Sequence, residues 1–150
     1  MLKDIGVALE EYQTKYRRSD VPSLRPSGVY SLFPEETGRP TDLCWPAKYP
    51  HCEKKGVYFI FGKTGRLLYI GKASLTSLGD RVGSYFRYAD DKKTCKIKGT
   101  WKDSPAFLAT VAVPDDMPFE AAALEEFLIG RLKPSENTVG MDRERFAMNL

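Results

Sequence analysis

Long apolar runs, cysteine pairs and histidine are scarce in this chain of 150 residues. No stretch approaches the roughly 18 apolar residues of a membrane-spanning helix, so we expect no membrane partner. Lys3, Asp4, Glu10 and Glu11 interrupt the apolar pattern of the N-terminus, which argues against a signal peptide. The three cysteines are an odd number, which argues against a disulfide framework and predicts a reducing compartment, with the cytoplasm as the default.

One segment has a clear excess of basic over acidic residues. The net charge of the whole chain is only +3, but residues 81–102 contain seven basic and two acidic side chains, with Tyr85, Tyr88 and Trp101 among them. Such a segment is typical of a surface that binds a polyanion, although lysines that keep a loop soluble give the same composition. The basic residues are Arg81, Arg87, Lys92, Lys93, Lys96, Lys98 and Lys102.

Apolar residues recur at helical spacing in residues 2–18, 77–88 and 119–132, and we expect a fourth, short helix at 142–148. Residues 21–53 contain six of the ten prolines, so neither a continuous helix nor a central strand is expected there. Aromatic residues in this Pro-rich segment favour an ordered strap that wraps the domain, with a linker as the alternative. These aromatic residues include Tyr30, Phe33, Trp45 and Tyr49.

Two triplets flank a turn in the middle of the chain, Gly56-Val57-Tyr58 before it and Tyr69-Ile70-Gly71 after it. The turn itself, Gly62-Lys63-Thr64-Gly65, is typical of a β-hairpin. On adjacent antiparallel strands the phenols of Tyr58 and Tyr69 can converge on one point, which indicates chemistry rather than packing alone. Alternation assigns the side chains of the first strand to two faces, with Tyr58 and Ile60 on one and Val57, Phe59 and Phe61 on the other.

After the hairpin come the helix at 77–88, a β-rich apolar run at 106–113 and the helix at 119–132. The order is therefore β-β-α-β-α, which predicts an α+β fold with a small three-stranded antiparallel sheet flanked by helices. We expect three parts: an N-terminal helix and Pro-rich strap or linker (1–53), this central domain (54–140) and a C-terminal helical tail (141–150).

The paired triplets resemble the signature of the GIY-YIG nuclease family. A second copy of the first triplet, Gly28-Val29-Tyr30, has no Tyr-Ile-Gly partner within reach of a hairpin, so we treat it as a coincidence. From Gly56 to Asn137, the order and spacing of further residues look most like the nuclease module of bacterial excision-repair endonucleases of the UvrC kind. These residues are Tyr69-Ile70-Gly71-Lys72-Ala73, Arg81, Ser84-Tyr85-Phe86, Glu125, Leu128-Ile129, Lys133-Pro134 and Asn137.

This resemblance implies a metal-dependent DNA endonuclease that hydrolyses phosphodiester bonds through a single activated water. Tyr58 would be the general base, and its phenol, with an ordinary pKa of about 10, needs a cation such as Lys72 or Arg81 nearby. Glu125 would bind one cation, Mg²⁺ or Mn²⁺, because a single carboxylate with several retained waters suits these ions. The other implied catalytic residues are Tyr69, Lys72, Arg81 and Tyr85, on the water or the phosphate, and Asn137, which ties the loop near the metal.

Each of these residues also has an ordinary structural interpretation. The tyrosines Tyr58, Tyr69 and Tyr85 can simply pack in the core. Lys72 can be a solvated surface lysine, and Asn137 can be an ordinary turn residue. Arg81 can form an ion pair with a helix carboxylate. Glu125 can be a helix-surface glutamate that pairs with a lysine. It shares a helix face with apolar residues, whereas its competitor Glu126 points about 100° away around the helix.

A zinc site is a weaker interpretation of the same chain. Cys44, His51 and Cys52 are close in sequence and Cys95 is distant, but no C-x-x-C spacing is present. The single histidine also lies outside the nuclease-like residues, which argues against a histidine-based nuclease.

Two other functions remain compatible with the sequence. One is a DNA-binding module of the same fold without catalysis, and the other is an RNA-directed nuclease, which no residue here distinguishes. The loop before Arg81 is slightly longer than in the repair enzymes, and no large second domain supplies target recognition. We therefore expect target choice to come from the Pro-rich segment, the basic segment, self-association as a homodimer or a partner protein, with the protein at the nucleoid when it is bound to DNA.

Overall fold

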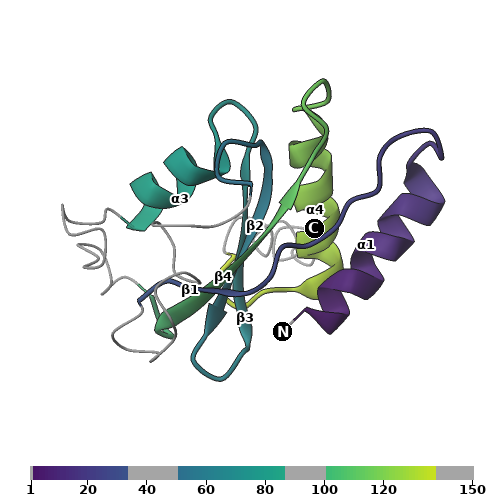
Figure 1. Cartoon of the computed structure of the whole chain (residues 1–150). Helices are drawn as coiled ribbons and strands as arrows, with labels where there is room; N and C mark the ends of the chain where they lie inside the picture. The colour runs from purple at the N-terminus through teal and green to yellow at the C-terminus, as the bar shows by residue number, and fades with distance from the viewer. Residues whose placement is uncertain (1, 34–50, 87–100, 138–150) are drawn as a thin grey trace, which may run out of the picture.

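The computed structural model describes residues 2–33, 51–86 and 101–137, in which four antiparallel strands form one sheet with helices on both faces (Figure 1). The strand order across the sheet is β1-β4-β2-β3, which confirms the α+β class. Of the helices described, none has the length and apolar character needed to cross a membrane. The elements are α1 (Lys3–Tyr16), β1 (Tyr30–Ser31), β2 (Gly56–Gly62), β3 (Leu67–Ala73), α3 (Leu78–Phe86), β4 (Pro105–Ala112) and α4 (Glu120–Leu132).

The sheet has one strand more than the three that were predicted. The additional strand β1 consists of Tyr30 and Ser31, which pair with Leu108 and Phe107 of β4. Tyr30 is the last residue of the second Gly-Val-Tyr copy, so this copy plays no part in the hairpin but leads into an edge strand. Two residues carry too little alternation for a strand to be recognised in the sequence, and their partner lies far along the chain.

Strands β2 and β3 form the central hairpin that the two triplets and the turn between them predicted. Tyr58 of β2 lies opposite Gly71 of β3 in the register of the two strands. In the turn, Gly65 has a φ of 84°, which glycine adopts without steric cost, and its N–H donates to the Gly62 carbonyl at 3.0 Å. Because β4 pairs with the other side of β2, β2 is a central strand, and β3 is left at the edge of the sheet.

Two apolar cores lie on opposite faces of the sheet. Helices α1 and α4 cover the face that carries Val57, Phe59 and Phe61, while α3 covers the face that carries Tyr58 and Ile60. Figure 1 shows α1 and α4 together on one side of the sheet and α3 on the other. This division confirms the predicted alternation of β2.

The helices predicted at 2–18 and 119–132 and the third predicted strand agree with α1, α4 and β4 to within two residues at each end. The helix predicted at 77–88 begins within one residue of α3, and its last two residues lie outside the described part. At the start of α3 the Oγ of Ser77 accepts a hydrogen bond from the Asp80 N–H at 3.1 Å, which satisfies a free donor of the first turn. Helix α4 ends where Lys133 adopts the left-handed conformation, with a φ of 48°, and Pro134 follows. The helix predicted at 142–148 lies outside the described residues.

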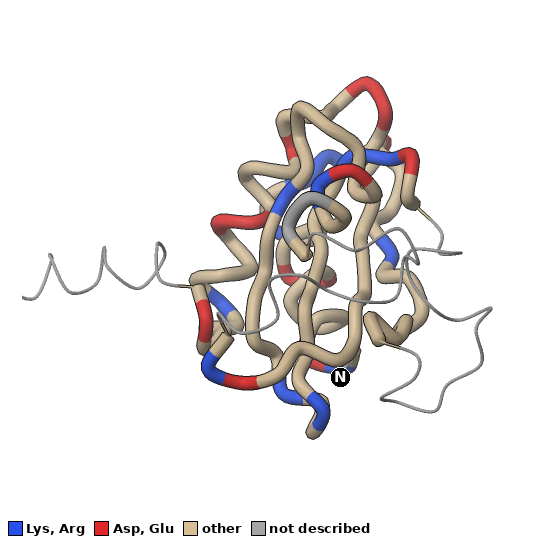
Figure 2. Tube along the Cα trace, turned by 90° about the vertical axis from the view of Figure 1, so that its left-hand side faces the viewer, with Lys and Arg blue, Asp and Glu red and all other residues tan. Residues whose placement is uncertain are grey.

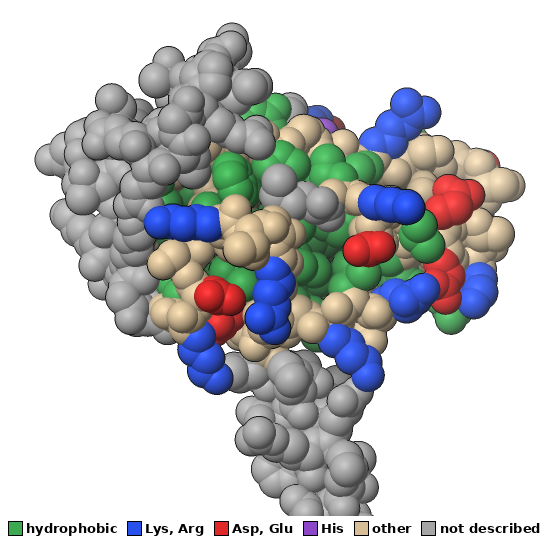
Figure 3. All heavy atoms as spheres, turned by 90° about the horizontal axis from the view of Figure 1, so that it is seen from below, with side chains coloured by type: hydrophobic (Ala, Val, Ile, Leu, Met, Phe, Trp, Pro, Cys, Tyr) green, Lys and Arg blue, Asp and Glu red, His purple; other side chains and the backbone are tan. Residues whose placement is uncertain are grey.

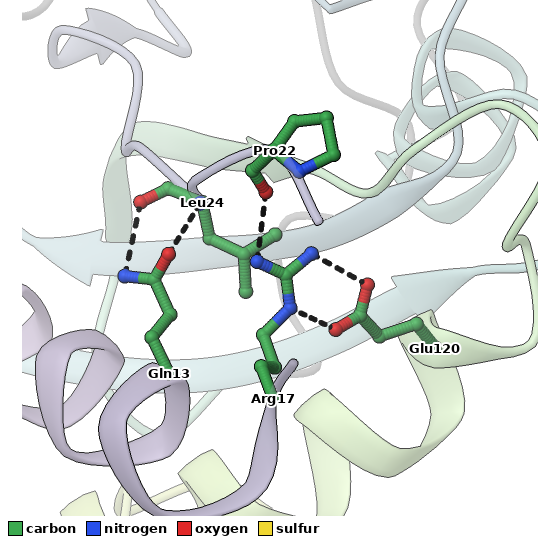
Figure 4. Close-up of polar contacts among 5 residues, drawn as sticks. All are labelled: Gln13, Arg17, Pro22, Leu24 and Glu120. Carbon is green, nitrogen blue, oxygen red and sulfur yellow. Dashed lines mark hydrogen bonds and ion pairs between the residues drawn. The ribbon is translucent and has the colours of Figure 1, made fainter. Parts of the chain in front are cut away.

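The chain segment after α1 is tied to the N-terminal end of α4 (Figure 4). The Arg17 guanidinium forms a two-pronged ion pair with the Glu120 carboxylate at 2.5 and 3.1 Å, and the two side chains are only 5% and 4% exposed. Arg17 also donates to the Pro22 carbonyl at 2.7 Å. The side-chain oxygen of Gln13 accepts from the Leu24 N–H at 2.7 Å, so α1 itself holds the passing strap.

Beyond Leu24 the strap follows the edge of β4. The Ser27 N–H donates to the Thr110 carbonyl at 2.7 Å, and the Ser27 Oγ accepts from the Thr110 N–H at 2.9 Å. Pro26 forms an isolated bridge with Val111 at the same edge. Proline is tolerated at this position because an edge strand needs hydrogen bonds on one side only.

Candidate active site

The glycines of the two triplets, Gly56 and Gly71, lie where another part of the chain approaches too closely for a side chain. Tyr58 is fully buried, and its phenol crosses over Gly71, its register partner. A Cβ atom on Gly71 would lie 2.3 Å from the Tyr58 hydroxyl oxygen, so a side chain at this position would have to displace the phenol. A Cβ atom on Gly56 would lie 2.0 Å from the Val111 carbonyl oxygen of β4. Gly71 therefore makes room for a tyrosine side chain, whereas Gly56 makes room for the backbone of the neighbouring strand.

Tyr69 interacts with four of the other predicted site residues, Tyr58, Lys72, Arg81 and Glu125. The centroids of its ring and of the Tyr58 ring are 6.1 Å apart. Burial is the main cause that raises the pKa of the Tyr69 phenol, and the Glu125 carboxylate raises it further. The Arg81 cation, hydrogen bonding with Tyr58 and the Lys72 cation each oppose this effect only in part. With its pKa raised, Tyr69 stays protonated near neutral pH and is suited to donate a hydrogen bond to a water or a phosphate oxygen.

Lys72 and Glu125 form an ion pair near this phenol. The distance from Lys72 Nζ to Glu125 Oε2 is 2.7 Å, and the two side chains are 40% and 17% exposed. Alternation points Lys72 to the face of β3 opposite that of Tyr69, and this is the face that α4 covers. The competitor Glu126 is exposed, whereas Glu125 is half-buried. Of the two neighbouring glutamates, it is Glu125 that contacts β3, the strand that carries Tyr69, through its ion pair with Lys72.

Helix α3 carries the two remaining catalytic candidates from the middle of the chain. Arg81 is exposed, and its charge acts on Tyr69. Leu78 and Val82, on either side of it in the helix, are fully buried and hold α3 on the sheet. Arg81 therefore stands at the rim of the packed face of α3. The backbone of Tyr85 belongs to α3, but its side chain is outside the described part of the structure.

Asn137 fastens the outer edge of β3. Its Oδ1 accepts a hydrogen bond from the Ile70 N–H, and its Nδ2 donates to the Ile70 carbonyl, both at 2.8 Å. The Glu136 N–H donates to the Leu68 carbonyl at 2.7 Å, so the segment after α4 runs along the edge strand. The Asn137 residue is only 5% exposed. Its contacts are with the backbone on either side of Tyr69, which makes it a residue that positions the strand.

The predicted DNA-binding residues fall almost entirely outside the described residues. Arg81 and Lys102 are described and are exposed. Basic and acidic residues are interspersed along the described chain (Figure 2). The view from below shows separate Lys and Arg side chains with acidic ones between them, not one continuous basic patch of described residues (Figure 3). The others, Arg87, Lys92, Lys93, Lys96 and Lys98, lie outside the described part.

The sequence neighbours His51 and Cys52 do not build a metal site with other described residues. The Nδ1 of His51 is 3.1 Å from the Thr110 Oγ1, and burial, helped by the Lys54 cation, lowers the pKa of the imidazole. In the described ranges no group of three or more His, Cys, Asp or Glu side chains is arranged to hold a metal ion. The two other cysteines, Cys44 and Cys95, lie outside these ranges.

Sequence reasoning missed two contacts of the site. Trp101, assigned to the basic segment, packs edge-on against Tyr69 with ring centroids 5.9 Å apart and an interplanar angle of 87°. The second contact is the ion pair between Lys72 and Glu125, which are 53 residues apart in the chain. A tryptophan within a polar segment is a signal that its ring packs against the core, but no local pattern indicates the pairing of Lys72 with Glu125.

Comparison with known proteins shows the family of this chain. A family model described as the UvrC-like GIY-YIG domain matches residues 54–138. The UvrABC system protein C of Aliarcobacter butzleri is 36% identical over 100 residues, which cover 61% of this chain and 15% of that protein. The UvrABC system protein C of Helicobacter pylori is 34% identical over 96 residues, which cover 61% of this chain and 16% of that protein.

The protein of the same name from Desulforudis audaxviator is 34% identical over 94 residues, which cover 63% of this chain and 14% of that protein. The chain therefore matches only a small part of the length of these curated relatives. The family model, in contrast, covers more than half of the chain and includes the hairpin, α3, β4 and α4. The chain belongs to the family of UvrC-like GIY-YIG domains.

Proposed function

We propose that this chain is an endonuclease domain that hydrolyses phosphodiester bonds in DNA with the help of one divalent cation. The supporting observation is that four side chains from two strands and two helices act on the Tyr69 phenol, Tyr58 through ring contact and Lys72, Arg81 and Glu125 through their charges. Hydrolysis of a phosphodiester requires a base for the water, cationic groups for the phosphate and a ligand for the metal. These side chains supply each of the three.

The roles follow from the surroundings of each side chain. Tyr58 is the general base in this proposal, and its phenolate oxygen would take the proton of the attacking water. Tyr69 keeps its own proton and donates a hydrogen bond that orients the water or a phosphate oxygen. Arg81 is exposed at the rim, where its guanidinium is able to bind two phosphate oxygens at once.

The donor set fits a hard divalent cation. Glu125 offers one half-buried carboxylate, and Lys72 engages its Oε2. A single carboxylate together with retained waters is typical of Mg²⁺, or of Mn²⁺ in its place. When bound, the cation would supply charge stabilisation for the phosphate and the leaving oxygen.

The relatives are named for the UvrABC system, and we propose that this chain acts on DNA in the same kind of process, excision repair. The matches cover only 15% and 16% of these two relatives. We propose that target selection comes from residues outside the matched segment, from a second copy of the chain or from a partner protein.

Plasmid nicking with Mg²⁺ tests this proposal. We expect Glu125→Gln and Tyr58→Phe to lower the cleavage rate by about 10²- to 10⁴-fold, as the loss of an acid–base or metal-binding group does. Glu126→Gln, on the next residue of α4, is the matched control and is expected to cleave like the parent. Undiminished cleavage by both of the first two variants would reject these roles.

The same assay separates the alternative functions. DNA binding without metal-dependent cleavage of any DNA by the parent protein would identify a binding module. Cleavage of RNA but not of DNA would identify an RNA-directed nuclease. Duplex, flap, branched and mismatched DNA are the substrates to compare, because they differ in the strand geometry presented to the site.

A further inference from the structure

Trp101 connects the catalytic hairpin to the end of α3. Its ring meets the Tyr69 ring edge-on, with centroids 5.9 Å apart, and is stacked on the Phe86 ring, with centroids 6.0 Å apart and planes 12° apart. Phe86 is fully buried and is the last residue of α3, whereas Trp101 is half-buried. The buried Phe86 ring therefore supports one face of the Trp101 ring, and the Tyr69 ring packs edge-on against Trp101.

Tyr69 needs such support because it lies on an edge strand. Among the described residues no further strand pairs with the outer side of β3, and those that complete this edge, around Asn137, contact its backbone. The ring itself is contacted by Tyr58 and by Trp101, at centroid distances of 6.1 and 5.9 Å. Since aromatic pairs favour particular ring orientations, these two neighbours restrict the direction in which the Tyr69 hydroxyl points.

We infer that Trp101 is a positioning residue of the nuclease site: it holds the Tyr69 phenol in the orientation in which its hydroxyl faces the groups around Glu125 and Arg81. This inference rests on the proposed function. Trp101 does not itself touch the reacting atoms in this assignment. A small displacement of a group that orients the water is enough to slow the reaction, because the reacting atoms must be aligned closely.

The competing explanation is that Trp101 only fills the core. Phe33 provides the matched control, because it also packs edge-on against Phe86, with centroids 6.2 Å apart, and is buried in the same core. Within the described residues, the ring contacts of Phe33 do not include Tyr69. Loss of either aromatic ring weakens the support of Phe86, but loss of Trp101 also releases Tyr69.

Cleavage kinetics give the first test. We expect Trp101→Ala to lower the rate at saturating DNA by about 10- to 100-fold, with the dissociation constant for a labelled duplex unchanged. Trp101→Phe is expected to recover most of the rate, and Phe33→Leu to keep it although its melting temperature falls. A parent-like rate in Trp101→Ala, or an equal loss in Phe33→Leu, would overturn the inference. Trp101→Leu, which keeps apolar bulk, replaces the alanine variant if that variant does not fold.

Fluorine NMR gives a second test that does not depend on activity. The eight tyrosines are labelled with 3-fluorotyrosine, and the Tyr69 signal is assigned by its absence in Tyr69→Phe. We expect this signal to shift in Trp101→Ala and to stay in place in Phe33→Leu; an unmoved signal in Trp101→Ala would overturn the inference. If the parent protein does not cleave DNA at all, the proposed nuclease function fails, while the fluorine signal still decides whether Trp101 positions Tyr69.

Discussion

Replacement of Arg17 by methionine is expected to destabilise the fold much more than the same replacement of its neighbour Arg18. The Arg17 and Glu120 side chains are only 5% and 4% exposed, so the substitution leaves a carboxylate buried without its cation. Loss of one partner from a buried ion pair costs about 3–5 kcal/mol. Arg18 pairs with Asp20, but these side chains are 81% and 63% exposed, and such a surface pair contributes only about 0–1 kcal/mol.

The difference is large enough to measure. A chain of this size loses about 2–4 °C of melting temperature per kcal/mol, so Arg17→Met should melt about 10 °C lower than the parent and Arg18→Met should stay close to it. Urea unfolding, followed by circular dichroism, gives the corresponding free energies of unfolding. The double variant Arg17→Met, Glu120→Leu should regain most of the loss, because it leaves no unpaired buried charge. Equal losses in Arg17→Met and Arg18→Met would refute the reasoning.

Three further predictions concern the hairpin. Gly71→Ala places a Cβ atom 2.3 Å from the Tyr58 hydroxyl, so it should cost about 1–3 kcal/mol in thermal melts and reduce DNA nicking; a parent-like melt would contradict the geometry. Asn137→Ala removes two buried hydrogen bonds of 2.8 Å, and faster amide hydrogen exchange at Ile70 should report the loss, with unchanged exchange as the negative result. The raised pKa of Tyr69 means that stability present below pH 10.0 is lost as the pH rises through the folded-state pKa. Tyr69→Phe should therefore flatten the alkaline fall of the urea midpoint, and an identical fall in both proteins would rule out this linkage.

The parts of the fold that the sequence predicted are those set by local patterns. The turn at Gly62–Gly65 and the alternation of β2 determine the hairpin, and the apolar periodicity of α1 and α4 determines two helices. Strand β1 was missed because two residues carry no periodicity and their pairing depends on β4. Nothing in either segment alone brings Lys72 to Glu125, since their contact depends on how α4 packs against β3.

The basic segment shows a second limit of sequence reasoning. Composition grouped Trp101 with the lysines around it as a surface for a polyanion, but its half-buried ring contacts Tyr69 and Phe86 and packs against a core cluster. Burial of a large aromatic ring is the usual outcome even in a polar segment, because it removes much apolar area from water. The sequence correctly placed Glu125 and Glu126 on different sides of the helix, because an α-helix has a definite period of about 3.6 residues per turn.

The contribution of α1 to the core determines where this domain can be cut. A fragment that began at residue 54, where the family match starts, would lack Ile5, Leu9 and Tyr12, which pack against α4 in the same core. Its exposed α4 would present an apolar surface to water and a carboxylate at Glu120 without the guanidinium that neutralises it. We therefore expect a unit that folds on its own to begin with the N-terminal helix, well before residue 54, where the family match starts.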